Sequence, residues 1–153
     1  MRVAIGSDHA GYELKQYLER ELERLGHQVV DLGTHSGTEP VDYPDFCFPV
    51  GEMVARGEAD RGIVLGGSGI GESIAANKVP GVRAAVVTSE ETARLTRQHN
   101  DSNVLALGGR TNRDHAEVAR WLKIWLETGF DGGRHVRRLE KIREYETAHF
   151  LKQ

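Results

Sequence analysis

The chain has 153 residues, of which 39% are hydrophobic and 28% charged, with a formal net charge of −3. This size and composition predict one compact domain over residues 1–153, and the mild acidity provides no basic surface for nucleic acid or an anionic membrane. The single cysteine, Cys47, excludes an internal disulfide and suits a reducing compartment. No apolar run approaches the ~20 residues of a membrane span, and the N-terminal segment reaches Asp8 too soon for a signal peptide. We therefore expect a cytoplasmic protein.

Short β-branched runs alternate along the chain with segments of helical period. The predicted strands are residues 2–6, 28–32, 62–66, 82–87 and 103–108. Between the first two strands, helical spacing is shown by Leu14, Leu18, Leu22 and Leu25, and Gly26 is a suitable stop. A weaker helix before the third strand carries Phe46, Val50, Met53 and Val54, and a stronger one after the fifth carries Val118, Leu122, Trp125 and Leu126. A final charged helix starts near Arg134, with Leu139, Ile142 and Tyr145 as its apolar positions.

The predicted strands are almost continuously apolar, as are strands covered on both faces. The alternating pattern predicts a doubly wound, Rossmann-like α/β fold with a parallel sheet of about five strands. Ligands of such sheets bind beyond the carboxyl ends of the strands. Polar segments follow four of the strands: "SDHAG" (7–11), "GGSGIGES" (66–73), "TSEE" (88–91) and "GGR" (108–110). We expect several of them to converge on one rim, and the long segment 33–46 to be a binding loop.

The segment "GGSGIGES" resembles a phosphate-binding loop but has Glu72 where a P-loop has lysine. A fixed negative charge there would repel phosphate, and a dinucleotide fingerprint begun at Gly67 also fails, because its last glycine would fall on Glu72. In a third reading, the glycine backbone approaches a ligand closely and its N–H groups hold a developing oxyanion while Glu72 removes a proton. From the loop alone, two roles of Glu72 stay open: that base, or a first-turn residue favoured by the helix dipole.

Two further polar pairs are candidates for a site. Asp8 and His9 end the first strand, where they could orient a sugar hydroxyl or move its proton; alternatively Asp8 is a helix N-cap. His99 and Asn100 end a helix before the fifth strand, where a histidine is equally favoured by the helix dipole.

Arginines mark a candidate anion site in the segment "GGRHVRR" (132–138). Arg134 and Arg138 lie four residues apart, hence on one helical face, with His135 beside them. Guanidinium groups suit phosphate, although such a face is often simply solvated. Arg110, directly after the fifth strand, adds a further candidate contact.

Several residues are assigned no chemistry. Cys47 lies among apolar neighbours and is expected to be a packed thiol. Trp121 and Trp125 share one helical face and should serve the core or an interface. The histidines show no metal-binding spacing, so no metal site is expected, and the surface is the expected place of His27, His35, His115 and His149.

Five motifs in one order resemble the ribose-5-phosphate isomerase type B family, which includes galactose- and allose-6-phosphate isomerases. These motifs are "SDHAG", "DYP" (42–44), "GGSGIGESIAANKVPGVRAA" (66–85), "RQHNDSNVLALGGR" (97–110) and "GGRHVRRLEKI" (132–142). The resemblance implies a Rossmann-type fold and a metal-free, cofactor-free aldose–ketose isomerase acting on a phosphorylated sugar. It also implies a homodimer, in some members a tetramer, with each active site shared between subunits.

The resemblance also implies roles for individual residues. His99 would open the furanose ring with help from Asp8, and Ser68 with the backbone around Gly67, Gly69, Ile70 and Gly71 would stabilise a cis-enediolate. Phosphate or sugar contacts would fall to His9, Arg110, Arg134, His135 and Arg138, and the pocket lining to Tyr43 and Asn100.

One position separates two branches of this family. Some members have a cysteine base directly before the "GSG" core, where this chain has Gly66. Others have a glutamate base at the position of Glu72, so the resemblance implies the glutamate branch. Helical N–H donors would lower the pKa of that carboxyl and burial would raise it.

Three functions follow from these observations. The leading one is interconversion of ribose 5-phosphate and ribulose 5-phosphate. The second keeps the chemistry but changes the sugar, to allose or galactose 6-phosphate or a tetrulose phosphate. The third is a non-catalytic sensor of a sugar phosphate or nucleotide on the same fold.

Overall fold

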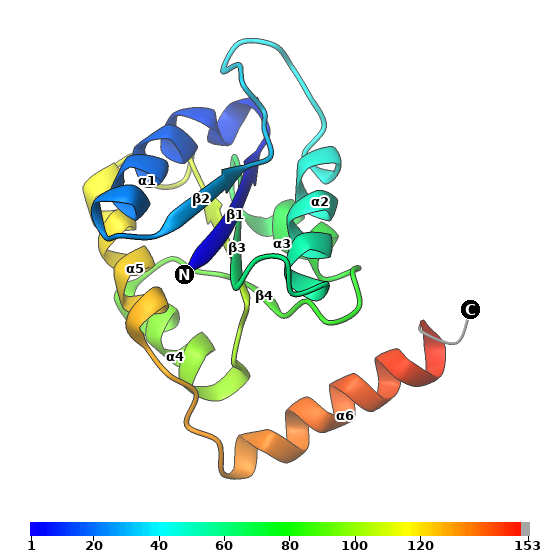
Figure 1. Cartoon of the computed structure of the whole chain (residues 1–153). Helices are drawn as coiled ribbons and strands as arrows, with labels where there is room; N and C mark the ends of the chain where they lie inside the picture. Colours follow the sequence, from blue (N-terminus) through cyan, green and yellow to red (C-terminus); the bar gives the residue numbers. More distant parts are fainter. Residues whose placement is uncertain (151–153) are drawn as a thin grey trace.

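The computed structural model describes residues 1–150 and has a five-stranded parallel sheet at its centre (Figure 1). The strands are β1 (Arg2–Ser7), β2 (Gln28–Asp31), β3 (Arg61–Gly66), β4 (Ala84–Val86) and β5 (Val104–Gly108), in the order β2-β1-β3-β5-β4. The predicted parallel α/β fold is therefore confirmed. The fourth strand is shorter than the expected 82–87, because its pairing with β5 covers only Ala84 to Val86.

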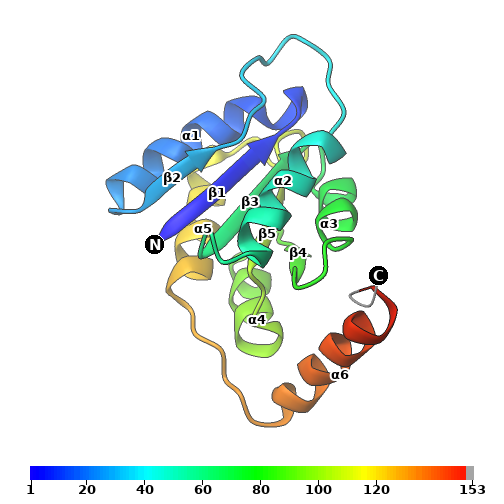
Figure 2. The ribbon, with the colours of Figure 1, turned by 45° about the vertical axis from the view of Figure 1, so that its right-hand side comes forward.

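Helices cover both faces of the sheet. The 3₁₀ turn η1 (His9–Gly11) leads into α1 (Tyr12–Arg24), and the other helices are α2 (Pro44–Ala55), α3 (Ile70–Ala76), α4 (Glu90–Asn100), α5 (His115–Glu127) and α6 (Arg134–His149). Figure 2 shows α1 and α5 on one side of the strands and α2 and α3 on the other. None of the helices within residues 1–150 is both long enough and apolar enough to cross a membrane.

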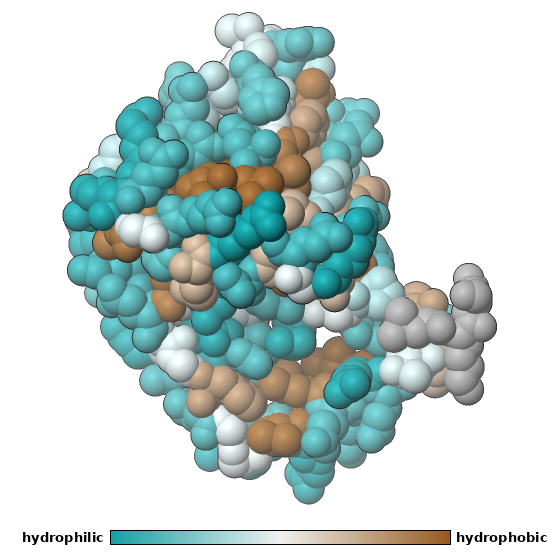
Figure 3. Space-filling view, viewed as in Figure 1, coloured by the Kyte–Doolittle hydropathy of each residue, from teal (hydrophilic) through white to brown (hydrophobic). Residues whose placement is uncertain are grey.

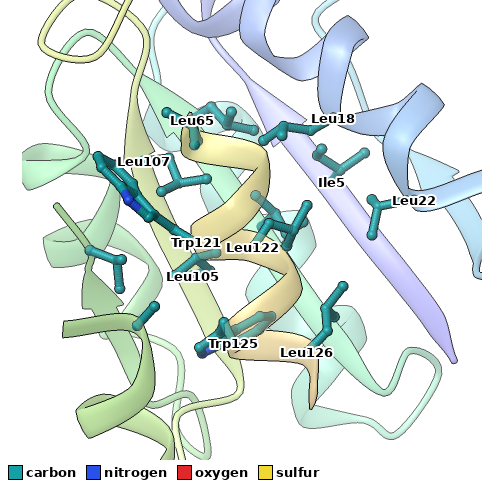
Figure 4. Packing of buried hydrophobic residues seen from close by; sticks show 14 of the residues in the cluster. Ile5, Leu18, Leu22, Leu65, Leu105, Leu107, Trp121, Leu122, Trp125 and Leu126 are labelled. Carbon is teal, nitrogen blue, oxygen red and sulfur yellow. The ribbon is translucent and has the colours of Figure 1, made fainter. Parts of the chain in front are cut away.

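Each face of the sheet has its own core. On the α1 and α5 side, the predicted leucine stripe packs with both tryptophans, as Figure 4 shows. Trp125 is fully buried and its Nε1 donates to Ser102 Oγ at 2.9 Å, so Trp121 and Trp125 belong to the core rather than to an interface. On the other face, small residues of α3 pack with Cys47 and Val50 of α2.

The last helix departs from this pattern. Figures 1 and 2 show α6 projecting from the body as an arm. No residue of α6 is buried, and two of its predicted apolar positions, Ile142 and Tyr145, are 49% and 59% exposed. The sequence pattern predicted this helix correctly, but the apolar side of the helix is not covered by any other part of residues 1–150.

Two of the four histidines expected at the surface are half-buried. His27 Nδ1 lies 3.0 Å from the N-terminal amine, and the His115 ring packs 5.3 Å from Tyr17 between α1 and α5. Only His35 and His149 are exposed as expected.

Candidate active site

Three of the expected loops meet at the carboxyl edge of the sheet. The Asp8 N–H donates to Leu65 O at 3.2 Å, joining the β1 loop to β3. The Gly109 N–H donates to Gly66 O at 2.8 Å, and Arg110 N–H donates to Gly67 O at 3.0 Å. The fourth segment, "TSEE", instead provides the capping box of α4 through Ser89 and Thr92. The convergence of the first three loops is confirmed.

The glycine loop lies tightly on the ends of the strands. Gly69 caps α3 with φ of 83°, a left-handed conformation that glycine adopts without strain. A β-carbon there would also come within 3.1 Å of the Leu107 backbone. The loop backbone thus reaches the sheet edge at a distance that a side chain would prevent.

Glu72 points back into this edge from the first turn of α3. Its side chain is 3% exposed, and its carboxylate lies against the α-carbon of Gly66, so closely that a β-carbon at Gly66 would overlap Oε1. Among the described residues, Oε2 is buried without a hydrogen-bond partner. A buried carboxylate oxygen without a partner is costly and is typical of a functional group.

Burial raises the pKa of Glu72 above its ordinary value, and the nearby Asp8 carboxylate raises it further. The backbone N–H groups of Glu72 and Gly69 lower the pKa but do not outweigh burial. The sequence left open whether helical N–H groups or burial would determine the direction of this pKa shift, and in the structure burial determines it. A carboxylate with a raised pKa is a stronger base than an exposed one.

Asp8 lies near this carboxylate, and His9 follows Asp8 in the chain. Asp8 is buried, and its Oδ1 accepts from the N–H groups of Ala10 and Gly11 at 2.9 and 3.1 Å, so it is the N-cap of η1. Its other oxygen is not used by this cap. His9 Nδ1 accepts from Val41 N–H at 3.2 Å, which leaves the proton of the neutral ring on Nε2.

The remaining residues of this edge surround the glycine loop. A β-carbon at Gly71 would meet the Tyr43 ring at 2.7 Å, and one at Gly67 would lie 3.5 Å from Arg110 Cδ. Tyr43 and Arg110 therefore flank the loop, and Ser68 Oγ accepts from Ile70 N–H at 3.2 Å.

Cys47 lies closer to this site than the sequence indicated. Its thiol is fully buried in α2, and burial together with the Glu72 and Asp8 carboxylates raises its pKa well above the ordinary range. The thiol stays neutral, in agreement with the expected packing role. No local pattern indicated this proximity, because it depends on α2 packing against α3.

A second group of candidate residues lies at the start of α6. The rings of His99 and His135 stack with centroids 4.4 Å apart, and Asp131 N–H donates to Gln98 O at 3.0 Å. Partial desolvation and the neighbouring His99, Arg134 and Arg138 lower the pKa of His135. Asn100 ends α4 beside this stack, and its carbonyl accepts from Arg83 Nε at 3.2 Å.

The two groups lie at opposite ends of the strands, the first at the carboxyl ends and the second at the amino ends. Glu72 contacts Gly66 at the carboxyl end of β3, whereas His99 and Asn100 end the helix that precedes the amino end of β5. Gly62 pairs with Val104 at that amino end. At ~3.3 Å per residue, the run from Gly62 to Gly66 separates the edges by roughly 13 Å. One chain therefore does not assemble all the candidate residues in a single pocket.

Comparison with known proteins places these observations in a family. The model of the Ribose/Galactose Isomerase family matches residues 3–142. The Bacillus subtilis protein named "Putative sugar phosphate isomerase YwlF" is 47% identical over 148 residues, covering 95% of this chain and 97% of that protein. The structure of Clostridium thermocellum ribose-5-phosphate isomerase B superposes with a TM-score of 0.94 at 50% identity, covering 97% of this chain and 99% of the other. The Mycoplasma genitalium ribose-5-phosphate isomerase B structure, with bound ribulose 5-phosphate, has a TM-score of 0.91 at 43% identity, covering 95% and 96%.

Proposed function

Because the chain belongs to the ribose/galactose isomerase family and is a sugar-phosphate isomerase, we propose that it interconverts ribose 5-phosphate and ribulose 5-phosphate. The observation that carries the chemistry is the buried Glu72 carboxylate, which is held against Gly66 and whose Oε2 has no hydrogen-bond partner within residues 1–150. Of the proposed substrates, ribulose 5-phosphate is the molecule bound in the Mycoplasma genitalium relative.

Glu72 acts as the base of the proposed reaction. It removes the proton from C2 of the open-chain aldose, and the C2–H electrons form the C1=C2 bond of a cis-enediolate while negative charge collects on O1. Backbone N–H groups of Gly67 to Gly71, with Ser68, stabilise that charge. The hydroxyl proton of O2 passes to O1, Glu72 returns the carbon-bound proton to C1, and C2 becomes the ketone carbon. The raised pKa of Glu72 suits this double role, because the group must both accept and donate a proton.

The other candidate residues bind or open the sugar. Asp8 at one edge and His99 at the other assist ring opening, and the lining of the pocket is assigned to Tyr43 and Asn100. The phosphate is assigned to His9, Arg110, Arg134, His135 and Arg138, since guanidinium groups match phosphate oxygens. In this division the reacting carbons lie near Glu72, and the phosphate ligands are divided between His9 and Arg110 at that edge and the three residues of α6.

A second copy of the chain completes each site in this proposal. Glu72 and His99 lie at opposite edges of one sheet, so a partner must supply one of the two groups. The exposed side of α6 supports this: a groove of about 590 Å³ separates α6 from the body, lined by apolar residues that include Pro80, Val136 and Leu139. Figure 3 shows hydrophobic surface along this opening. We assign the groove and the α6 arm to contacts within a homodimer.

The function is tested with the purified protein in excess EDTA. Proton NMR in D₂O follows ribose 5-phosphate, allose 6-phosphate, galactose 6-phosphate and tetrulose phosphates, and reports both product and solvent exchange at C1 and C2. Rapid conversion of ribose 5-phosphate, unaffected by EDTA, is expected. Faster conversion of another sugar would overturn the substrate and keep the chemistry. Binding of a sugar phosphate with neither turnover nor exchange would favour a sensor instead.

A further inference from the structure

Lys15 of α1 is a charged residue in the interior of the protein. Its side chain is 1% exposed, and Nζ lies 2.6 and 2.7 Å from the two carboxylate oxygens of Asp31 and 3.5 Å from Glu19 Oε1. Lysine is rarely this buried unless it is paired. A buried ion pair is by itself weak evidence for stability, because desolvation offsets the attraction. The position of this pair indicates another role.

Asp31 connects the buried ammonium to the root of a loop. It is the last residue of β2, and its Oδ1 also accepts from the Gly33 N–H at 2.9 Å. Gly33 begins the long connection from β2 to α2. The carboxylate that neutralises Lys15 therefore also fixes the first turn of this connection.

The root of the loop is bonded in turn to the strand that carries Asp8. The Ser7 N–H donates to Gly33 O, and the Thr34 N–H donates to Ser7 O, both at 2.8 Å. The next residue, Asp8, is bonded on the other side to Leu65 of β3. The backbone before the Asp8 carboxylate is thus held between the loop and the sheet.

The far end of the same loop reaches the candidate site. A β-carbon at Gly37 would meet the Tyr12 ring at 2.9 Å, and the Val41 N–H donates to His9 Nδ1. Figures 1 and 2 show the loop rising from β2 beside α1 and descending to α2. Lys15 and Asp31 hold its start, and His9 contacts its end.

From this continuous run of contacts we propose that Lys15 and Asp31 are positioning residues for the isomerase reaction, which set the root of the 33–43 loop and through it the place of Asp8 and His9. This role rests on the proposed function. Neither side chain touches the substrate. Four of the five residues assigned to the phosphate lie outside this run of contacts, and only His9 lies in it, so loss of the pair should lower kcat more than it raises KM.

The test uses the full chain with Lys15→Met, Asp31→Asn and their combination. Asp31→Asn keeps a similar volume and an oxygen that can accept from the Gly33 N–H. This variant should therefore fold, and it tests the proposal even if Lys15→Met does not fold. Arg24→Met is the matched control, because it breaks the exposed Arg24–Glu21 pair, 2.7 Å long, on the same helix. Steady-state kinetics give kcat and KM per folded molecule, and amide hydrogen exchange is measured at Ser7, Gly33 and Thr34.

We expect kcat to fall about tenfold or more in Lys15→Met, since small displacements of catalytic groups cost 10²-fold in rate at the extreme. KM should change by less than about threefold, and amide exchange at the three positions should accelerate, with Arg24→Met unchanged in all respects. Lower thermal stability with unchanged kcat in the folded variants would show a purely structural pair and overturn the proposal. If the wild-type protein isomerises none of the sugars, the proposed function fails, while unchanged exchange in the variants separately refutes the link to the loop.

Discussion

The Glu72 carboxylate occupies the space that a side chain at Gly66 would fill. Any β-carbon at position 66 must displace Oε1, so the two positions are sterically coupled. This coupling gives a physical reason for a glycine before the "GSG" core in a chain that carries a glutamate at position 72.

Gly66→Ala should displace the carboxylate and lower kcat by about 10²-fold or more, the usual contribution of a general base. Gly129→Ala is the control, because a β-carbon there would meet nothing within 4 Å and the residue lies outside the candidate site. Steady-state kinetics of the two variants measure the difference. Equal activity of Gly66→Ala and the wild type would show that the carboxylate need not lie where it does.

Glu72→Gln should lose turnover by about 10²–10⁴-fold while sugar-phosphate binding survives. The same change removes a buried ionisable group, so the folded state at neutral pH should gain on the order of 1 kcal/mol, or roughly 2–4 °C in Tm for a domain of this size. Single-turnover kinetics, isothermal titration and thermal melts check the three effects. A variant that is both inactive and less stable would indicate that Glu72 serves packing rather than proton transfer.

The pH dependence of kcat/KM should show the raised pKa of Glu72. The base acts as a carboxylate, so activity should fall as the pH drops through a midpoint above 4.5, the ordinary pKa of a glutamate. The unfolded chain ionises at the ordinary value first, so stability should decrease as the pH rises from 4.5 through that midpoint. A pH–rate profile between pH 4 and 9 gives the midpoint, and a value at or below 4.5 would contradict the burial of the base.

Mixing two inactive variants should restore activity if each site is shared. Glu72→Gln damages one group of residues and His99→Ala the other, so a hybrid dimer keeps one intact site. After co-refolding in equal amounts, about a quarter of the wild-type rate is expected, because half the dimers are hybrid and one of their two sites is complete. Mixtures no more active than either parent would place both groups in sites of a single chain.

Glu19 makes the Lys15 pair sensitive to pH. Burial and the hydrogen bond to Asp31 raise its pKa to about 7. Burial acts on the Asp31 pKa in the same direction, but hydrogen bonds from Glu19 and Lys15 outweigh it and keep that pKa below its ordinary value. The folded state therefore holds a proton that the unfolded chain loses near 4.5, and stability falls as the pH rises from 4.5 to about 7. Glu19→Gln imitates the protonated form and should raise Tm at pH 8 but change it little at pH 5. The exposed Glu23→Gln on the same helix is the control, and an identical Tm change at both pH values would refute the assignment.

Much of the fold followed from local patterns. The β-branched runs, the leucine stripe of α1 and the glycines of 66–71 are properties of neighbouring residues, and they located the strands, the first helix and the site loop. Because ligands bind at the carboxyl ends of parallel strands, several polar loops were expected to meet there. In the structure, hydrogen bonds join three of them at that end of the sheet. The boundaries of β4 were less well placed, because strand length depends on the partner strand.

The chemistry of the site depended on tertiary structure. The sequence placed Glu72 in the loop but left the direction of its pKa shift open, since burial is produced by packing of α3 on the sheet. The approach of Cys47 to that carboxylate, and the run of contacts from Lys15 to Ser7, join residues of different elements. No local spacing encodes such distances.

The sequence by itself determined which residues are candidates for the chemistry, because residue type and loop position are properties of the chain. Only the tertiary structure decided that Glu72 and His99 lie at opposite edges of one sheet, because a helix that precedes a strand ends at the edge opposite the loop that follows it. It likewise showed that residues 1–150 leave the apolar side of α6 uncovered. Those two facts turn a list of candidate residues into a proposed site that needs a second copy.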